Sequence, residues 1–433
     1  MQPPDKSKAS RSVPVRRTAA AEAAPSPLRN PAFRNLLAIS ITVAIGFGMV
    51  IPVLPNYARS FGVGLAAIGL VQLVFGLMRF SFGIVGGLIV DRFSDRASVI
   101  AGLLIVALSS YAAGFSTTFV QLVAARGFGG AGSALFIAGL MNRIIRTIEP
   151  AAMGRATGQF RASFLVGIGI GPFLGGLVAK YFGIAAPFHF YATGLLVATV
   201  IAFFVMRAQV VQRSAERKKP LEALRAAAPL FRDRRYVLAL AATLVGWWTL
   251  SGPAQTIGPV FAKEELGFSN DVIGLAVTML AVGEILILLV VGRAADFYGR
   301  KAVIVPALAL TAVAVALLGQ ITDAPWAYFP LMVGIGAGVA AGGVASGGLL
   351  ADSIPEGGSG AAVGVNQMAG DLGYLLSPTI IGFIAENNGF PLAYIVGGIP
   401  AALVLLWAMT LPNYRAEQRT PAPEAVEPGT AVG

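Results

Sequence analysis

Four charged residues interrupt apolar segments that are otherwise long enough to cross a membrane. Arg79 and Arg126 lie in the first half of the chain, and Glu284 and Asp371 lie in the second half. A charge inside the hydrocarbon region costs roughly 3 kcal/mol on insertion scales, so such a residue usually marks a pathway or an ion pair. A carboxylate that loses its basic partner in a low-dielectric site favours its protonated form. The four residues therefore predict ion pairs and a proton-binding group within the membrane.

Two of these charges occupy the same position of an internal repeat. Arg79 precedes Asp91 by 12 residues, and Glu284 precedes Asp296 by 12 residues, so the repeat carries opposite charges at this position. Further residues recur with an offset of 204 to 206, namely Pro55 as Pro259, Pro150 as Pro355, and Gly176 as Gly382. In transporters built from parallel repeats, the binding site lies near mid-membrane between the two halves.

The segments that hold these charges are predicted to be membrane-spanning helices. Hydrophobic residues make up 56% of the 433 residues and charged residues 12%, whereas a soluble domain carries about 25% charged residues. Because a helix crosses a bilayer with about 20 apolar residues, the sequence predicts twelve spans and excludes a soluble enzyme. The spans are expected near 35–57, 66–88, 98–115, 119–142, 160–180, 188–206, 237–262, 271–292, 302–320, 325–350, 362–385 and 391–411.

The basic residues predict the orientation of these spans. With the N-terminus inside, 27 of the 32 Lys and Arg residues fall in cytoplasmic segments and 3 fall outside. By the positive-inside rule, both termini are cytoplasmic in a cell membrane. The net charge of +11 is then a sign of topology and not of nucleic-acid binding. We expect a disordered cytoplasmic tail over 1–34, a six-helix bundle over 35–206, a basic cytoplasmic linker over 207–236, a second bundle over 237–411, and a disordered cytoplasmic tail over 412–433.

The composition also limits the chemistry. The chain has no cysteine and one histidine, which excludes disulfides, thiolate or histidine metal clusters and a Ser-His-Asp triad. A glycine-rich phosphate loop with its lysine is missing as well, so the sequence does not indicate ATP use. We therefore expect no catalytic residues, no metal and no cofactor.

Two loop motifs at related positions of the repeat resemble the loop signature of the major facilitator superfamily. Their residues are Gly87, Asp91, Arg92 and Arg96 after the second span, and Gly292, Asp296, Gly299, Arg300 and Lys301 after the eighth. The first copy departs from the family pattern at two positions. Ser94 stands where the family usually has glycine, and Asp95 stands where it usually has a base.

Motifs within the spans extend this resemblance over residues 35–411. Arg126-x-x-x-Gly130-x-Gly132 resembles the buried-arginine motif of the superfamily. The fifth span holds a second motif, made of Gly167, Gly169, Gly171, Pro172, Gly175 and Gly176. Together with Ile51-Pro52-x-x-Pro55 in the first span, it is similar to the 12-span drug:proton antiporter branch.

The resemblance implies an all-α membrane protein with twelve transmembrane helices in two pseudo-symmetric six-helix bundles, the major facilitator fold. The second span would lie beside the eleventh, and the fifth beside the eighth. The loop motifs would form a latch that holds the cytoplasmic side shut. Gly167, Gly171 and Gly175 share one helix face, which suits either a sliding gate or ordinary close packing of small residues.

Ion pairs across the two halves follow from this arrangement. Arg79 and Asp371 would each lie about nine residues, or roughly 14 Å, from the cytoplasmic helix ends, so we expect them to pair. Glu284 and Arg161 form a second candidate pair. Either pair is a proton-coupling element or a static contact that fixes helix packing. Because the first span lacks the acid that many such exporters carry, Glu284 or Asp371 would bind the proton, with Arg126 as electrostatic partner.

The resemblance places the substrate cavity among spans 1, 4, 7 and 10, with contributions from spans 2, 5, 8 and 11. An indole face can stack on a flat lipophilic or cationic molecule. The candidate cavity residues are Gln72, Phe75, Trp247, Trp248, Gln255, Asn366 and Gln367.

The function that the resemblance implies is proton-coupled efflux of amphipathic small molecules by alternating access, by a monomer in the lipid bilayer and with the proton gradient as energy source. Two alternatives stay open. The same fold would also serve an importer or a narrow-range exporter of a metabolite such as a sugar, an organic acid or a siderophore. The second alternative is a membrane sensor or scaffold that transports nothing, and the short outer loops argue against it.

Overall fold

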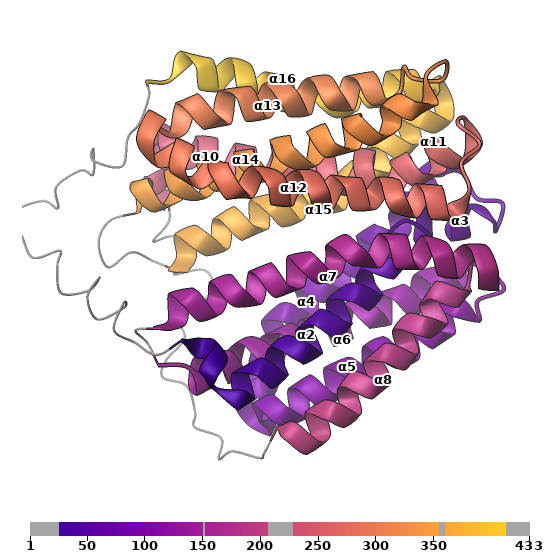
Figure 1. Ribbon diagram of the computed structural model, residues 1–433, viewed down its shortest axis with the longest axis vertical. Helices are drawn as coiled ribbons and strands as arrows, with labels where there is room; N and C mark the ends of the chain where they lie inside the picture. Colours follow the sequence, from indigo (N-terminus) through magenta and orange to yellow (C-terminus); the bar gives the residue numbers. More distant parts are fainter. Residues whose placement is uncertain (1–25, 150–151, 207–227, 355–359, 413–433) are drawn as a thin grey trace, which may run out of the picture.

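The computed structural model describes residues 26–149, 152–206, 228–354 and 360–412, and this described part is helical without a strand (Figure 1). The helices of the first half are α2 (Pro31–Val50), α3 (Leu54–Arg59), α4 (Leu65–Phe93), α5 (Asp95–Gly114), α6 (Phe119–Thr147), α7 (Met153–Phe182) and α8 (Ala186–Val205). Those of the second half are α10 (Arg234–Thr249), the π-helical η4 (Leu250–Ile257), α11 (Gly258–Glu264), α12 (Asn270–Tyr298), α13 (Arg300–Leu318), α14 (Tyr328–Ser353), α15 (Gly360–Asn388) and α16 (Phe390–Thr410).

Twelve helical segments of the described residues are long and apolar enough to cross a membrane, which confirms the predicted number of spans. The first segment of each half differs from the uninterrupted span that we predicted. α2 ends at Val50 and α3 begins at Leu54, while α10 continues through the π-helical η4 into α11. Proline explains both irregularities, because it lacks an N–H and its ring clashes with the carbonyl four residues earlier. Pro52 lies in the first break, and Pro253 lies inside η4.

The two halves pack against each other mainly through two pairs of helices. α4 lies against α15, and α7 lies against α12, as the family resemblance implies. Figure 1 shows the halves converging at the end of the bundle that carries α3 and α11, here called the α3 end. They separate toward the opposite end, here called the tail end, where α2 begins and α16 ends.

Glycines bring the backbones of the two halves into contact near the α3 end. A Cβ atom on Gly274 of α12 would collide with the backbone carbonyl of Pro172 on α7. A Cβ on Gly176 would lie 2.5 Å from the carbonyl oxygen of Asn270, and one on Gly382 of α15 would lie 2.5 Å from that of Leu65. Small residues of this kind let membrane helices approach closely.

Polar contacts also join the halves at the α3 end, and in each of them the donor comes from the same half. Arg59 Nε lies 2.7 Å from Glu264 Oε1, and Lys180 Nζ lies 2.8 Å from Asp271 Oδ2. The backbone N–H of Ala66 donates to Glu386 over 3.1 Å. In all three contacts the first half supplies the donor and the second half supplies the carboxylate.

Candidate functional site

A group of polar and aromatic side chains lies where α4, α6, α10 and α15 meet, and we call it the central cluster. The Tyr374 hydroxyl donates to Gln72 Oε1 over 3.2 Å and so links the two halves. The Trp247 ring meets the Tyr374 ring edge to face, with centroids 6.0 Å apart. The guanidinium carbon of Arg126 lies 4.7 Å from the centroid of the Phe75 ring.

Four of the five cluster residues were candidates from the sequence, and Tyr374 was missed. Gln72 and Phe75 lie one turn apart on α4 and are both buried. Tyr374 lies three residues after Asp371, so both project from similar faces of α15. This spacing from an intramembrane charge is the signal that sequence reasoning had available.

Arg126 is buried without a counter-charge among the described residues. It is 2% exposed, and its Nε atom has no hydrogen-bond partner. Glycines on the same helix pack α6 closely onto its neighbours, since a Cβ on Gly130 would collide with the Phe75 carbonyl and one on Gly129 with the Ser109 hydroxyl. The polar groups that interact electrostatically with Arg126 are the hydroxyls of Tyr191 and Tyr374.

The two intramembrane acids are also unpaired in this structure. Glu284 on α12 and Asp371 on α15 are partly buried, while Arg79 and Arg161 are exposed. Among the described residues, neither carboxylate has an ion pair or a side-chain hydrogen bond. The predicted pairs Arg79–Asp371 and Glu284–Arg161 are therefore not formed in this conformation, and they stay predictions for another one.

The remaining cavity candidates do not join the central cluster. Trp248 Nε1 donates to the Gly397 carbonyl over 3.2 Å, so this indole packs toward α16 within its own half. Asn366 Oδ1 accepts from the Thr243 hydroxyl over 3.0 Å, again within the second half. Gln255 is partly buried in η4, and Gln367 is exposed on α15.

The glycine face of α7 packs within the first half, so in this structure these glycines make close helix packing, and their role as a sliding gate stays a prediction. A Cβ on Gly167 would lie 2.6 Å from Ala44 Cβ, and one on Gly171 would lie 2.6 Å from Gly48 Cα, both on α2. Gly175 packs against the backbone of Met49 in the same way. On a different face of α7, Gly169, Pro172 and Gly176 contact the other half. Helical spacing grouped the glycines correctly but did not reveal which neighbour each face meets.

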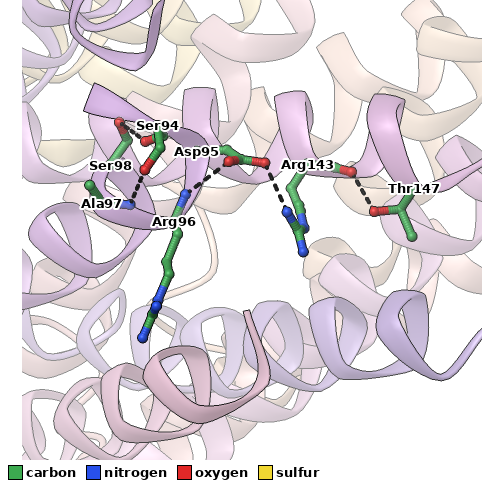
Figure 2. Close-up of polar contacts among 7 residues, drawn as sticks. All are labelled: Ser94, Asp95, Arg96, Ala97, Ser98, Arg143 and Thr147. Carbon is green, nitrogen blue, oxygen red and sulfur yellow. Dashed lines mark hydrogen bonds and ion pairs between the residues drawn. The ribbon is translucent and has the colours of Figure 1, made fainter. Parts of the chain in front are cut away.

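The loop motif at the tail end of the first half contains a buried ion pair (Figure 2). Asp95 Oδ2 lies 3.4 Å from Arg143 NH1, with the two side chains 1% and 8% exposed. Ser94 precedes α5, and its hydroxyl accepts a hydrogen bond from the Ala97 N–H over 3.2 Å. Arg96 points away from the pair in Figure 2 and donates to the Phe203 carbonyl over 2.7 Å.

The second half contains a similar ion pair with its charges exchanged, and its acid lies about one turn beyond the position that the repeat offset pairs with Arg143. Arg300 begins α13, as Asp95 begins α5, and its Nε lies 3.3 Å from Oδ2 of Asp352 near the end of α14. This exchange gives a physical reason for the acid that stands at 95 in place of the usual base. The base of the pair is supplied by Arg143 on α6 instead.

The structure describes two of the other loop-motif residues, Lys301 and Gly292. Lys301 Nζ donates to the carbonyls of Met409 and Leu411, each over 2.6 Å, and so holds the end of α16. Gly292 has open space around its Cα. Gly87 and the side chains of Asp91, Arg92 and Asp296 are outside the part of the chain that the structure describes.

The conformation of Ser94 leads to a first testable prediction. Ser94 has φ 113°, and Gly299 has φ 92° at the related position. A non-glycine residue there costs roughly 1–3 kcal/mol, whereas replacing a serine cap by glycine costs only a few tenths. We expect Ser94→Gly to stabilise the protein by about 1 kcal/mol, measured by thermal unfolding in detergent. Gly299→Ser is the matched reverse change and should destabilise it, and a lower unfolding temperature for Ser94→Gly would contradict the strain argument.

Comparisons with known proteins show which family the chain resembles. The family model described as Major Facilitator Superfamily matches residues 36–262 and 248–432. Multidrug resistance protein 2 of Bacillus subtilis (strain 168) is 25% identical over 279 residues, which cover 63% of this chain and 68% of that protein. The class H tetracycline resistance protein of Pasteurella multocida is 25% identical over 406 residues, covering 90% and 97%. The crystal structure of the nucleoside transporter NupG superposes with a TM-score of 0.72 at 16% identity, over 88% of this chain and 98% of that one.

Proposed function

The chain belongs to the major facilitator superfamily, and on that premise we propose that it exports amphipathic small molecules in exchange for protons. The observation that carries the proposal is the central cluster, which bridges the two halves through the Tyr374–Gln72 hydrogen bond. A molecule bound there touches both halves, so its binding affects their relative position. The names of the relatives, multidrug and tetracycline resistance proteins, support efflux of such molecules.

Alternating access is the second part of the proposal. The glycine contacts and ion pairs at the α3 end support a conformation that is closed there. We propose that the tail end faces the cytoplasm, since α8 ends there and α10 begins there, and the sequence over 207–236 is rich in basic residues. The other conformation would open the α3 end and close the tail end, moving the central cluster from one side of the membrane to the other.

Proton coupling is assigned to the two unpaired acids. A carboxylate in the membrane without a basic partner favours its protonated form, and it releases the proton when an arginine approaches. Asp371 would meet Arg79 in the conformation closed at the tail end, because α15 and α4 lie side by side. Glu284 would do the same with Arg161, because α12 lies against α7.

The efflux proposal is tested by the accumulation of a fluorescent amphipathic compound in cells that express the protein. We expect lower accumulation than in control cells, and we expect a protonophore to abolish the difference. A protein that is present in the membrane but has no effect on a panel of neutral, cationic and anionic compounds would contradict the proposal. It would favour the narrow-range metabolite carrier instead.

Glu284→Gln separates proton coupling from transport. The amide cannot bind and release a proton, so we expect uphill transport in proteoliposomes to fall about tenfold or more, while exchange of substrate across the membrane persists. Asp371→Asn is the parallel variant. If Asp371→Asn abolishes uphill transport and the double change Arg79→Gln with Asp371→Asn restores it, the Arg79–Asp371 pair is a static contact and not a proton site.

A further inference from the structure

We infer that Arg126 binds an anionic group of the transported molecule, so that flat aromatic anions such as carboxylates are the preferred substrates. The inference rests on the proposed function and narrows its substrate class. It is carried by the burial of Arg126, by its lack of a counter-charge among the described residues, and by the aromatic rings beside it.

The burial of the Arg126 guanidinium carries a desolvation cost. A guanidinium in a protein interior is expensive to desolvate unless an anion or several acceptors compensate it. Arg126 is 2% exposed, yet among the described residues no carboxylate pairs with it and its Nε has no hydrogen-bond partner. The Phe75 ring 4.7 Å away gives only a cation–π contact, worth about 0.5–2 kcal/mol. A bound anion would supply the missing compensation.

The acids of the chain do not take this role in the conformation described. Asp371 and Glu284 are the intramembrane acids, and among the described residues neither forms an ion pair with Arg126. The hydroxyls of Tyr191 and Tyr374 do interact with Arg126 electrostatically. The backbone of Glu284 packs onto Gly336 of α14, within the second half. The Tyr191 hydroxyl can donate a hydrogen bond to an anion beside the guanidinium, whereas the Tyr374 hydroxyl already donates its proton to Gln72.

The rest of the cluster fits the flat part of such a molecule. Trp247 is 41% exposed, and its ring meets that of Tyr374 edge to face. Gln72 accepts a hydrogen bond from the Tyr374 hydroxyl, so its amide belongs to the same cluster at the contact between the halves. Trp247 thus supplies an aromatic surface in the same cluster as the Phe75–Arg126 contact, which suits a ligand that combines a flat ring with a carboxylate.

The positive charge of Arg126 disfavours the binding of cationic ligands. A cationic ligand at the central cluster would be repelled by Arg126, and by Arg79 one turn beyond Phe75 on α4. Such repulsion is stronger in a low-dielectric site than in water. The substrate class therefore differs from the lipophilic cations that the tryptophans alone suggested.

The test uses three probes that share one ring and differ in charge: naphthalene-2-carboxylate, naphthalene-2-carboxamide and 2-naphthylmethylammonium. Their binding to the purified full-length protein in detergent is measured by equilibrium dialysis of radiolabelled probes. We expect the carboxylate to bind about tenfold more tightly than the amide, and the ammonium to bind more weakly than either. Arg126→Gln should remove the preference for the carboxylate, while Arg126→Lys should keep part of it, because a lysine keeps the charge but not the planar fork.

The outcomes separate this inference from the proposed function. Tighter binding of the ammonium or the amide than of the carboxylate by the unchanged protein overturns the inference, whatever the variants do. Equal preference for the carboxylate in a folded Arg126→Gln variant overturns the role of Arg126. Proton-driven transport of the three probes is measured separately in proteoliposomes. Transport of the ammonium or the amide without the carboxylate would refute only the anionic substrate class, whereas binding without any proton-driven transport would refute the exporter.

Discussion

Gly274→Val is expected to reduce transport by about tenfold or more, because overpacking a close contact typically costs 1–3 kcal/mol. Gly274 of α12 touches the carbonyl of Pro172 on α7, and a Cβ there collides with backbone, not with a flexible side chain. The valine side chain would force α7 and α12 apart, and this separation opposes closure of the α3 end. The variant should populate the conformation that is open at the α3 end, and transport requires both conformations to be reached.

Cysteine labelling measures this shift directly. The chain has no cysteine of its own, so a single cysteine can be introduced and labelled without background. Thr379 is a suitable position, since Thr379 packs against Gly69 where α15 meets α4. We expect a membrane-impermeant maleimide to label Thr379→Cys faster when Gly274→Val is also present.

The control for this experiment is Gly343→Ala on α14, where a Cβ meets no atom within 4 Å. It should leave both transport and labelling unchanged. Normal transport by Gly274→Val, with the variant folded, would show that closure at the α3 end does not depend on the contact between α7 and α12.

Asp95→Asn is expected to destabilise the first half by roughly 3–5 kcal/mol, because it leaves Arg143 buried opposite no carboxylate. The two side chains are 1% and 8% exposed and lie 3.4 Å apart. Thermal unfolding in detergent measures the loss. Asp323→Asn removes an exposed acid and serves as the control, with an expected change within about 0.5 kcal/mol.

The second half suggests how the lost stability can be regained. The double change Asp95→Arg with Arg143→Asp reproduces the order found in Arg300 and Asp352. We expect it to recover most of the stability lost in Asp95→Asn. If the double variant is no more stable than the single one, the two pairs are not equivalent and the exchange of charges is incidental.

The sequence predicted the architecture because the architecture depends on local properties. Span length, the repeat and the loop motifs follow from hydropathy and spacing, and the twelve spans are confirmed. The breaks near Pro52 and Pro253 were not predicted, because membrane helices often accommodate proline without interruption.

Contacts between distant segments were predicted less well. The Asp95–Arg143 pair joins residues 48 positions apart in the sequence. Hydropathy and residue spacing do not show that two such distant residues meet in space. The glycines on one face of α7 were grouped correctly, but their neighbour could not be predicted, since a helix with small residues on two faces can pack either one inward. The placement of Arg126 beside Phe75 depends on α6 meeting α4, which the spacing of neither helix reveals.

The polarity of the contacts at the α3 end has a consequence for assembly from fragments. Arg59 and Lys180 belong to the first half, while their partners Glu264 and Asp271 belong to the second. Two copies of the first half would bring base against base at this seam, and two copies of the second half would bring acid against acid. A duplicated chain of this kind can no longer be built from two copies of either half. Separately expressed halves should associate one with the other and not with themselves, so each transporter contains one of each.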